Sequence, residues 1–146
     1  MISVDTNILF KASVREDSNH GAAANFIMDI ARRRDVAISE FVLVELYRLL
    51  RNPAVMDVPL TAHDAVNVIQ GWRRHRHWRL VGFCANSPGL HADLWAHAST
   101  SGFAYRRIYD VRLALSLQHH GVREFATCNT KDFTNLGFER VWNPLV

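Results

Sequence analysis

The chain has 146 residues, of which 49% are hydrophobic and 21% are charged, with 17 basic and 14 acidic side chains. This composition indicates one folded domain, residues 1–146, that is large enough to bury its own core, and the small net charge of +3 excludes a polycation. No apolar run is long enough to cross a membrane and no signal peptide is recognisable, so we expect a cytoplasmic protein without membrane association. Cys84 and Cys128 are far apart and form no CxxC motif, which predicts two buried, reduced thiols.

The chain opens on a predicted buried strand that ends in an acid. Ile2 and Val4 are apolar and β-branched, as is typical inside a sheet. The short polar residues Asp5, Thr6 and Asn7 follow, and such residues commonly leave strands and cap helices. A parallel α/β sheet binds its ligands at the carboxyl ends of its strands. Asp5 would lie at that edge, where an acid suits a cation or a substrate.

The next predicted helix begins near Ser18-Asn19 and ends near Arg34, and a short strand is expected at residues 36–38. Three arginines, residues 32–34, close the last turn of this helix. Cations are favourable at the carboxyl end of a helix dipole, so a solvated helix end is preferred here over an RNA contact.

Ser39 is the predicted N-cap of a helix over residues 40–50. Its side chains are apolar on nearly every side, which predicts a buried helix. Glu45 and Arg48 interrupt the apolar pattern and are neighbours on one face, being three residues apart. A carboxylate in such a helix is costly unless it is compensated. The residues support two interpretations equally: an internal ion pair, or a carboxylate that points into a pocket and is held by Arg48.

A capping box at residues 61–64 starts another helix, which leads into the most basic segment of the chain, residues 72–79. A third strand is expected from about Trp78. Interleaved basic and aromatic residues can bind RNA through phosphates and stacked bases. We expect the two tryptophans of this segment to pack into the core and some of its arginines to contact RNA.

Residues 82–89 are a predicted loop, and a helix follows over residues 90–99. His91 and His97 lie within this helix. Their spacing of six residues does not bring them onto one face, so we expect surface histidines and not metal ligands.

The last long helix is predicted from Tyr105 to about Gln118, with Gly121 as its C-cap. Asp110 lies in its first turn, where an acid either complements the helix dipole or faces a metal near the strand ends. A fourth strand is expected at residues 124–127. A polar loop at residues 127–133 carries a further acid, Asp132, and a small strand at residues 140–142 ends the chain.

Strands alternate with helices in this order, which predicts a parallel sheet flanked by helices. In such a sheet Asp5 and the loop 127–132 both follow strand ends, and the helices of Glu45 and Asp110 open toward the same edge. Three or four acids can therefore converge. Carboxylate sites suit Mg²⁺ or Mn²⁺, ions that hold phosphates and activate water in phosphodiester hydrolysis. Without a metal these acids repel one another.

Four segments in this order and spacing resemble the PIN-domain ribonucleases, specifically the VapC-type toxins of bacterial toxin–antitoxin pairs. They are VDTNIL (residues 4–9), SEFVLVELYRLL (39–50), YDVRLALSLQHHG (109–121) and ATCNTKDF (126–133). The resemblance covers the full length of the chain. It implies a three-layer α/β/α sandwich around a mostly parallel sheet of four to five strands.

The resemblance also implies a Mg²⁺-dependent endoribonuclease, with Mn²⁺ as the alternative ion, that blocks translation, is held inactive by a cognate antitoxin and forms a homodimer. It places metal-binding acids at Asp5, Glu45 and Asp110, and Arg48 matches the ExxR spacing of the family. Supporting hydrogen bonds are expected from Thr6, Asn7 or Ser39. The RNA backbone is expected to contact Arg73, Arg74, Arg76, Arg106 and Arg107.

The fourth acidic position of the family departs from the usual pattern. Many relatives carry an acid two residues after the threonine that matches Thr127, whereas Asn129 stands there in this chain and the next acid is Asp132. Either residue could complete the site, Asn129 as a neutral oxygen ligand or Asp132 as a catalytic acid that reaches in, directly or through water. The number of bound metal ions is therefore open.

Two other functions are compatible with parts of the sequence. An aspartate-nucleophile phosphatase would also have an acid after its first strand, but it needs a second acid two residues later, where this chain has Asn7. A non-catalytic RNA-binding or scaffold protein would keep the fold and lose the acids, and three acids are present here. Only Asn129, which stands where many relatives have the fourth acid, favours a non-catalytic protein.

Overall fold

The computed structural model describes all residues 1–146 and contains one five-stranded sheet in the order β3-β2-β1-β4-β5. Every neighbouring pair of strands is parallel, so all strand carboxyl ends lie at one edge. The strands are β1 (Ile2–Val4), β2 (Val36–Ser39), β3 (Arg79–Val81), β4 (Glu124–Ala126) and β5 (Arg140–Trp142).

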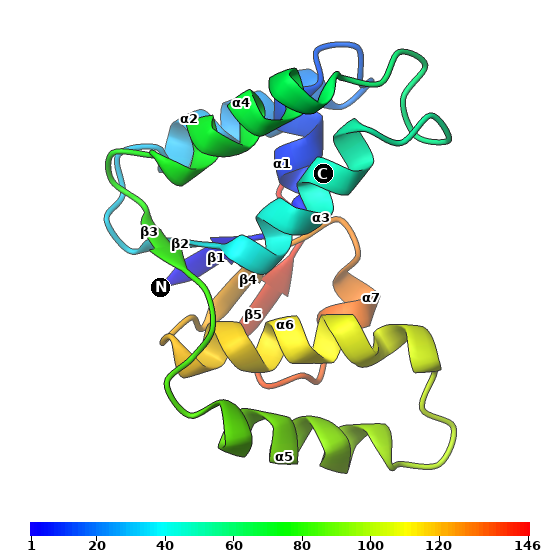
Figure 1. Cartoon of the computed structure of the whole chain (residues 1–146). Coiled ribbons are helices and arrows are strands. Elements are labelled where there is room, and N and C mark those ends of the chain that lie inside the picture. Colours follow the sequence, from blue (N-terminus) through cyan, green and yellow to red (C-terminus); the bar gives the residue numbers. More distant parts are fainter.

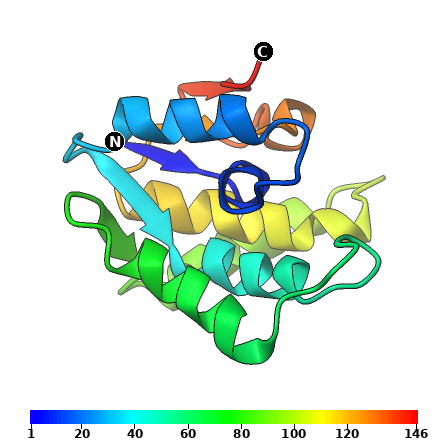
Figure 2. The same ribbon diagram turned by 90° about the horizontal axis from the view of Figure 1, so that it is seen from above.

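Helices cover both faces of the sheet (Figure 1). They are α1 (Thr6–Ser13), α2 (His20–Ile30), α3 (Glu40–Leu50), α4 (Ala62–Arg73), α5 (Ser87–Ala98), α6 (Ile108–His119) and α7 (Thr130–Phe133), with a 3₁₀ turn, η1, at Tyr105–Arg107. Helices α1, α2 and α4 lie on one side of the sheet, and α5, α6 and α7 lie on the other. Helix α3 packs against α1 and α4, and Figure 2 shows α3 running beside α4. The predicted three-layer sandwich is therefore confirmed.

Several predicted boundaries differ from the structure. Helix α2 ends at Ile30, before the arginine run, because the chain turns there: the Arg33 amide donates to the Ile30 carbonyl at 3.0 Å. Helix α5 begins at Ser87, inside the predicted loop, since Asn86 caps it and Pro88 is well tolerated in a first turn. The polar loop after β4 contains the short helix α7. No helix is long and apolar enough to span a membrane.

The prediction that helix α3 is buried all round is wrong. Its core-facing side chains are fully buried, but Val44 is 63% exposed and Glu45 and Arg48 are also exposed. Glu45 and Arg48 form no ion pair with each other. The proposed internal pair is therefore absent, and Arg48 does not hold Glu45. The exposed side of α3 removes the desolvation cost that an ion pair would have offset.

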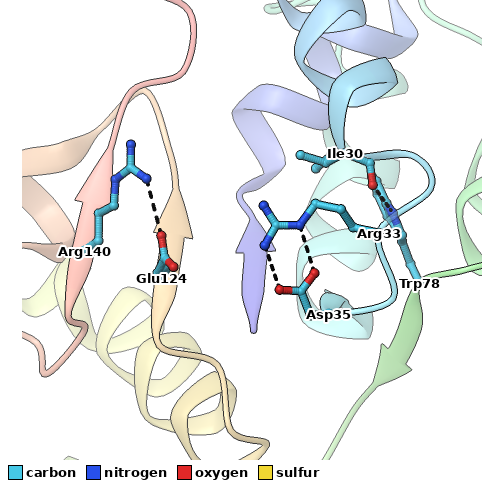
Figure 3. Close-up of polar contacts among 6 residues, drawn as sticks. All are labelled: Ile30, Arg33, Asp35, Trp78, Glu124 and Arg140. Carbon is cyan, nitrogen blue, oxygen red and sulfur yellow. Dashed lines mark hydrogen bonds and ion pairs between the residues drawn. The ribbon is translucent and has the colours of Figure 1, made fainter.

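The amino ends of the strands carry their own polar contacts (Figure 3). Arg33 forms a bidentate pair with Asp35 at 2.8 and 2.6 Å, and Arg140 lies 3.4 Å from Glu124 across β4 and β5. The Trp78 indole donates to the Ile30 carbonyl at 3.2 Å, which ties β3 to the end of α2. The charge of Arg33 is thus neutralised locally, which supports a structural role for this arginine.

A buried aromatic group fixes the loop that follows β4. Phe125 of β4 is completely buried, and the ring of Phe133 in α7 packs edge-on against it at 4.7 Å. Phe138 stacks on Phe125 at 5.3 Å. Because Phe133 is anchored in the core, α7 presents Lys131 and Asp132 to solvent beside the sheet edge.

Candidate active site

The candidate site begins where β1 and β4 end side by side. Strands β2 and β3 lie on one side of β1, and β4 and β5 lie on the other, so the order in which the chain adds strands reverses between β1 and β4. Ligands of open α/β sheets bind at such a switch point, outside the strand carboxyl ends. Asp5 follows β1 there and its amide donates to the Ala126 carbonyl at 2.9 Å. Thr127 follows β4 at the same edge.

Hydrogen bonds fix the Asp5 carboxylate on both oxygens. Its Oδ1 accepts from the Thr6 amide at 2.7 Å, which makes Asp5 the N-cap of α1. Its Oδ2 accepts from the Thr127 hydroxyl at 2.6 Å and from the Asn7 amide nitrogen at 3.0 Å. Asn7 in turn accepts from the Cys128 amide at 3.1 Å. Two loops, one after each strand, therefore hold this single side chain in place.

The charge of Asp5 is held in a poorly solvated position. The side chain is only 6% exposed, and this burial raises the pKa of Asp5 from 3.8 to about 6. The hydrogen bonds from Thr127 and Thr6 oppose the rise, whereas the negative charges of Glu45 and Asp110 add to it. A buried acid whose pKa is raised by other acids is an arrangement that a bound cation would relieve.

Glu45 joins the same group through Thr6. The Thr6 hydroxyl donates to Glu45 Oε2 at 2.9 Å, so the N-terminal turn of α1 contacts both acids. Glu45 is exposed and lies on α3, which packs against α1. Thr6 therefore orients the carboxylate of Glu45, a role that the sequence had assigned to Arg48.

Asp110 and Asp132 complete the acidic group from the other side. Burial, together with the charges of Asp132 and Glu45, raises the pKa of Asp110 to about 6. Arg107 has the opposite effect on the pKa of Asp110 and donates to the Asp132 carbonyl at 3.3 Å. The charge of each acid thus affects, or is affected by, the charge of at least one other acid. This indicates that residues from α3, α6, α7 and the start of α1 lie near one another at this edge.

Other candidate residues lie at or beyond the rim. Ser39 is buried and caps α3 by accepting from the Phe41 amide at 3.1 Å, so its contact is with the helix and not with an acid. Asn129 is exposed, and only its backbone amide joins the network, donating to the Thr127 hydroxyl at 3.0 Å. Asp132, whose charge acts on Asp110, is therefore better placed than Asn129 as the fourth position.

The five candidate RNA-binding arginines are not equivalent. Arg107 is the one whose charge acts on an acid of the group. Arg73 is paired with Glu40 at 2.9 Å, and Arg106 lies over the ring of Tyr105 at 5.7 Å. Arg74 and Arg76 are exposed near the amino end of β3. As expected, both tryptophans of this segment pack into the core: Trp78 is buried, and the partly buried Trp72 stacks on it at 6.0 Å.

The cysteines and histidines contribute no alternative metal site. Cys84 and Cys128 are reduced, as predicted, but only partly buried. Burial raises the pKa of the Cys128 thiol, which makes it a poor nucleophile. His91 and His97 are half-buried side chains of α5, which is compatible with the expected surface position, and the His91 ring contacts the Ser87 carbonyl at 2.8 Å. The structure contains no group of three or more His, Cys, Asp or Glu side chains close enough to enclose a metal ion.

The donor chemistry nevertheless fits an oxygen-seeking cation. Mg²⁺ usually keeps several waters and takes one or two carboxylates plus substrate phosphates, so it does not need a closed cage of side chains. The charge of Asp110 raises the pKa of Asp5, and the charge of Glu45 raises the pKa of both, as acids do when they share one cation site without the cation. Sequence reasoning missed the backbone amides of Thr6 and Cys128 and the side chain of Lys131, since no residue type marks an amide and a single lysine carries little signal.

We expect Thr127→Val to destabilise the protein by about 1–3 kcal/mol, because it removes the donor to Asp5 and leaves the Asn129 amide without its acceptor. The change should also raise the pKa of Asp5 further, since the Thr127 hydrogen bond lowers it. Urea unfolding measures the first effect. Thr134→Val is the matched control, because that exposed hydroxyl contacts only the Thr130 carbonyl. Equal stability of the two variants would contradict the role given to Thr127.

Comparisons with known proteins agree with this geometry. The chain matches the family model of the PIN domain over residues 2–139. Ribonuclease VapC24 of Mycobacterium tuberculosis, in strains CDC 1551 / Oshkosh and ATCC 25618 / H37Rv, is 50% identical over 145 residues, covering 99% of this chain and 97% of the relative.

Solved structures share the same fold. The crystal structure of Mycobacterium tuberculosis VapC20, a sarcin-ricin loop cleaving toxin, aligns with a TM-score of 0.67 at 21% identity, covering 94% of this chain and 96% of that one. FitAB bound to IR36 DNA aligns with a TM-score of 0.65 at 18% identity, covering 100% and 96%. VapBC2 from Rickettsia felis, bound to a promoter DNA fragment, aligns with a TM-score of 0.67 at 18% identity, covering 98% of each chain. The chain therefore belongs to the PIN-domain family and is a relative of the VapC ribonucleases.

Proposed function

We propose that this protein is a metal-dependent endoribonuclease, with Mg²⁺ as its ion, that acts as the toxin of a toxin–antitoxin pair. The observation that supports this most directly is the buried Asp5 at the β1–β4 edge, whose pKa is raised to about 6 by burial, with the charges of Glu45 and Asp110 adding to the rise. The 50% identity to Ribonuclease VapC24 supports RNA as the substrate. Inhibition of translation, which takes place in the cytoplasm, is the expected consequence of cleavage.

In this proposal Asp5, Asp110 and Glu45 hold the ion, and Asp132 supports the site from α7. A divalent cation supplies Lewis acidity to a phosphate and lowers the pKa of an attacking water. Thr127, Asn7 and the Thr6 amide keep the Asp5 carboxylate in one orientation, so little reorganisation is needed when substrate binds.

The cations around the acids would bind the RNA. Arg107 is the arginine at the site itself, because its charge acts on Asp110. Arg106, exposed beside Arg107, would add to the positive surface that attracts the phosphate backbone, whereas Arg74 and Arg76 lie near the amino end of β3, away from the acids at the strand carboxyl ends. Arg73 contributes less, since Glu40 neutralises it.

Two protein partners belong to the same proposal. A cognate antitoxin would cover the acids and keep the enzyme inactive. A second copy of the chain would form a homodimer through the exposed aromatic side chains near α3 and α6, where Phe83 is 77% and Tyr109 is 70% exposed. The ring of Phe41 contacts that of Phe83 at 5.1 Å, and the Arg112 guanidinium lies 5.2 Å over the Phe41 ring. These groups therefore form one continuous patch.

The proposed activity is tested by adding the purified protein to total cellular RNA with Mg²⁺ or with EDTA. We expect discrete fragments only in the presence of Mg²⁺, and sequencing their ends identifies the RNA target. RNA binding without cleavage under both conditions would instead support a non-catalytic RNA-binding protein of the same fold. Cleavage of small phosphate monoesters without RNA cleavage would support a phosphatase.

A further inference from the structure

A polar cavity of about 310 Å³ opens beside the acidic group, between α5, η1, α6 and α7. Its lining includes the cations Arg107 and Lys131, the rings of His97 and Phe103, and the hydroxyls of Thr100 and Thr134. No acid lines it. Its volume lies at the lower end of the range for ligand sites, which suits a single small unit of a larger substrate.

The cavity and the acids share the same two segments of chain. Val111, which lines the cavity, directly follows Asp110 in α6, and Lys131 directly precedes Asp132 in α7. Arg107 connects the two sites by donating to the Asp132 carbonyl at 3.3 Å. A ligand that reaches the acids therefore has this cavity as its immediate neighbour.

The charges of the cavity are free to bind an anion. The structure has four ion pairs, and neither Arg107 nor Lys131 takes part in any of them. Lys131 is exposed, and the one acceptor of Arg107 is a backbone carbonyl. Unpaired cations are the groups that bind phosphate oxygens.

An aromatic ring lies beside these cations. Phe103 is half-buried, and the Arg107 guanidinium lies 5.9 Å over its ring. Proteins bind single-stranded RNA by stacking bases on such rings and on guanidinium planes, while cations hold the backbone. Bases inside a duplex are already stacked and are not available for this contact.

We propose that this cavity binds one nucleotide of a single-stranded RNA segment, adjacent to the phosphodiester at the acids. The phosphate of that nucleotide lies on Lys131 and Arg107, and its base stacks on Phe103. This assignment rests on the proposed ribonuclease function. It adds that the substrate must be unpaired on at least one side of the cleaved bond.

The test measures binding of a single-stranded RNA oligonucleotide in EDTA, by fluorescence anisotropy at several salt concentrations. For Lys131→Gln we expect weaker binding and a log–log salt slope that is smaller by about 0.7, the value for one lost phosphate contact on a single strand. For Phe103→Leu, which keeps the apolar volume, we expect about tenfold weaker binding with an unchanged slope. Arg34→Gln, a charge removed at the amino end of β2, is the control and should change neither quantity by a comparable amount.

A second measurement locates the base directly. RNA that carries 5-iodouridine is cross-linked to the wild-type protein in EDTA, and the attached peptide is identified by mass spectrometry. We expect attachment at Phe103. Attachment at Phe83 or Tyr109, or an unchanged slope in Lys131→Gln while RNA still binds, would overturn this inference and leave the ribonuclease proposal intact. Failure of the wild-type protein to bind RNA at all would overturn both.

Discussion

Asp110→Asn will abolish Mg²⁺-dependent RNA cleavage and, in EDTA, will leave the protein at least as stable as the wild type. The loss follows because the variant removes one of the charges that hold the ion, and a loss on the order of a thousand-fold is expected. Stability does not fall because the charge of Asp110 is unfavourable without a metal: burial, Asp132 and Glu45 all raise its pKa. Cleavage assays and thermal unfolding in EDTA measure the two effects.

The two opposite effects separate a functional role from a structural one. Substitution of a residue that only supports the fold would lower the activity and the stability of the protein together. Asp29→Asn is the matched control, since it removes an exposed acid of α2 and should change neither quantity. Full cleavage by Asp110→Asn, or a clear drop in its unfolding temperature in EDTA, would contradict the position given to Asp110.

The position of Asp5 could be predicted because it depends on few residues. A short apolar strand followed by Asp5, Thr6 and Asn7 places the acid at a strand end whatever else the chain does. The same holds for Thr127 after β4. Parallel pairing then brings the two ends together, and the structure has Thr127 donating to Asp5 at 2.6 Å. Alternation of strands and helices was sufficient to predict a parallel sheet with both strand ends at one edge, but not that β1 and β4 are neighbours.

The surroundings of Glu45 could not be predicted in the same way. The apolar residues of α3 indicated burial on every side, but whether Val44 and Arg48 are covered depends on how α3 sits against α1 and α4. That arrangement comes from tertiary packing and leaves no periodic signal in the sequence. The spacing of three residues between Glu45 and Arg48 permitted an ion pair, yet the nearer partner is Thr6, which is remote in sequence.

The cavity beside the acids was missed for a similar reason. Polar residues after β4 predicted a loop, and the sequence did not reveal that Phe133 would anchor a helical turn there. That anchor places Lys131 opposite Arg107 and Phe103, two residues from a different part of the chain. The basic segment at residues 72–79 gave a stronger signal in sequence, but a run of like residues says nothing about which end of the sheet it occupies.

The fall in stability with rising pH will disappear when saturating Mg²⁺ is added. Without metal, Asp5 and Asp110 have pKa values near 6 in the folded protein, against about 3.8 when unfolded. The folded state therefore binds more protons than the unfolded state between about pH 4 and pH 6, so the metal-free protein loses stability as the pH rises through this window. For Asp5, which is almost fully buried, the loss is about 3 kcal/mol; for Asp110, which is partly exposed, it is smaller.

Mg²⁺ requires the ionised carboxylates, so protons compete with it for the same oxygens. If both acids hold the ion, its affinity should fall by roughly 10- to 100-fold between about pH 7 and pH 5, as one or both carboxylates become protonated. Above about pH 5 the metal-bound folded state and the unfolded state both keep these carboxylates ionised, so unfolding temperatures in saturating Mg²⁺ should be nearly constant from about pH 5 to pH 7, while those in EDTA fall. Calorimetric titration in buffers of different ionisation enthalpy counts the protons released.

Parallel curves with and without Mg²⁺, or metal affinity that is independent of pH in this window, would show that these two acids do not share the ion. The Asp110→Asn variant, which retains Asp5 alone, should keep most of the fall in EDTA and should show a similar fall with Mg²⁺, because it holds the ion poorly.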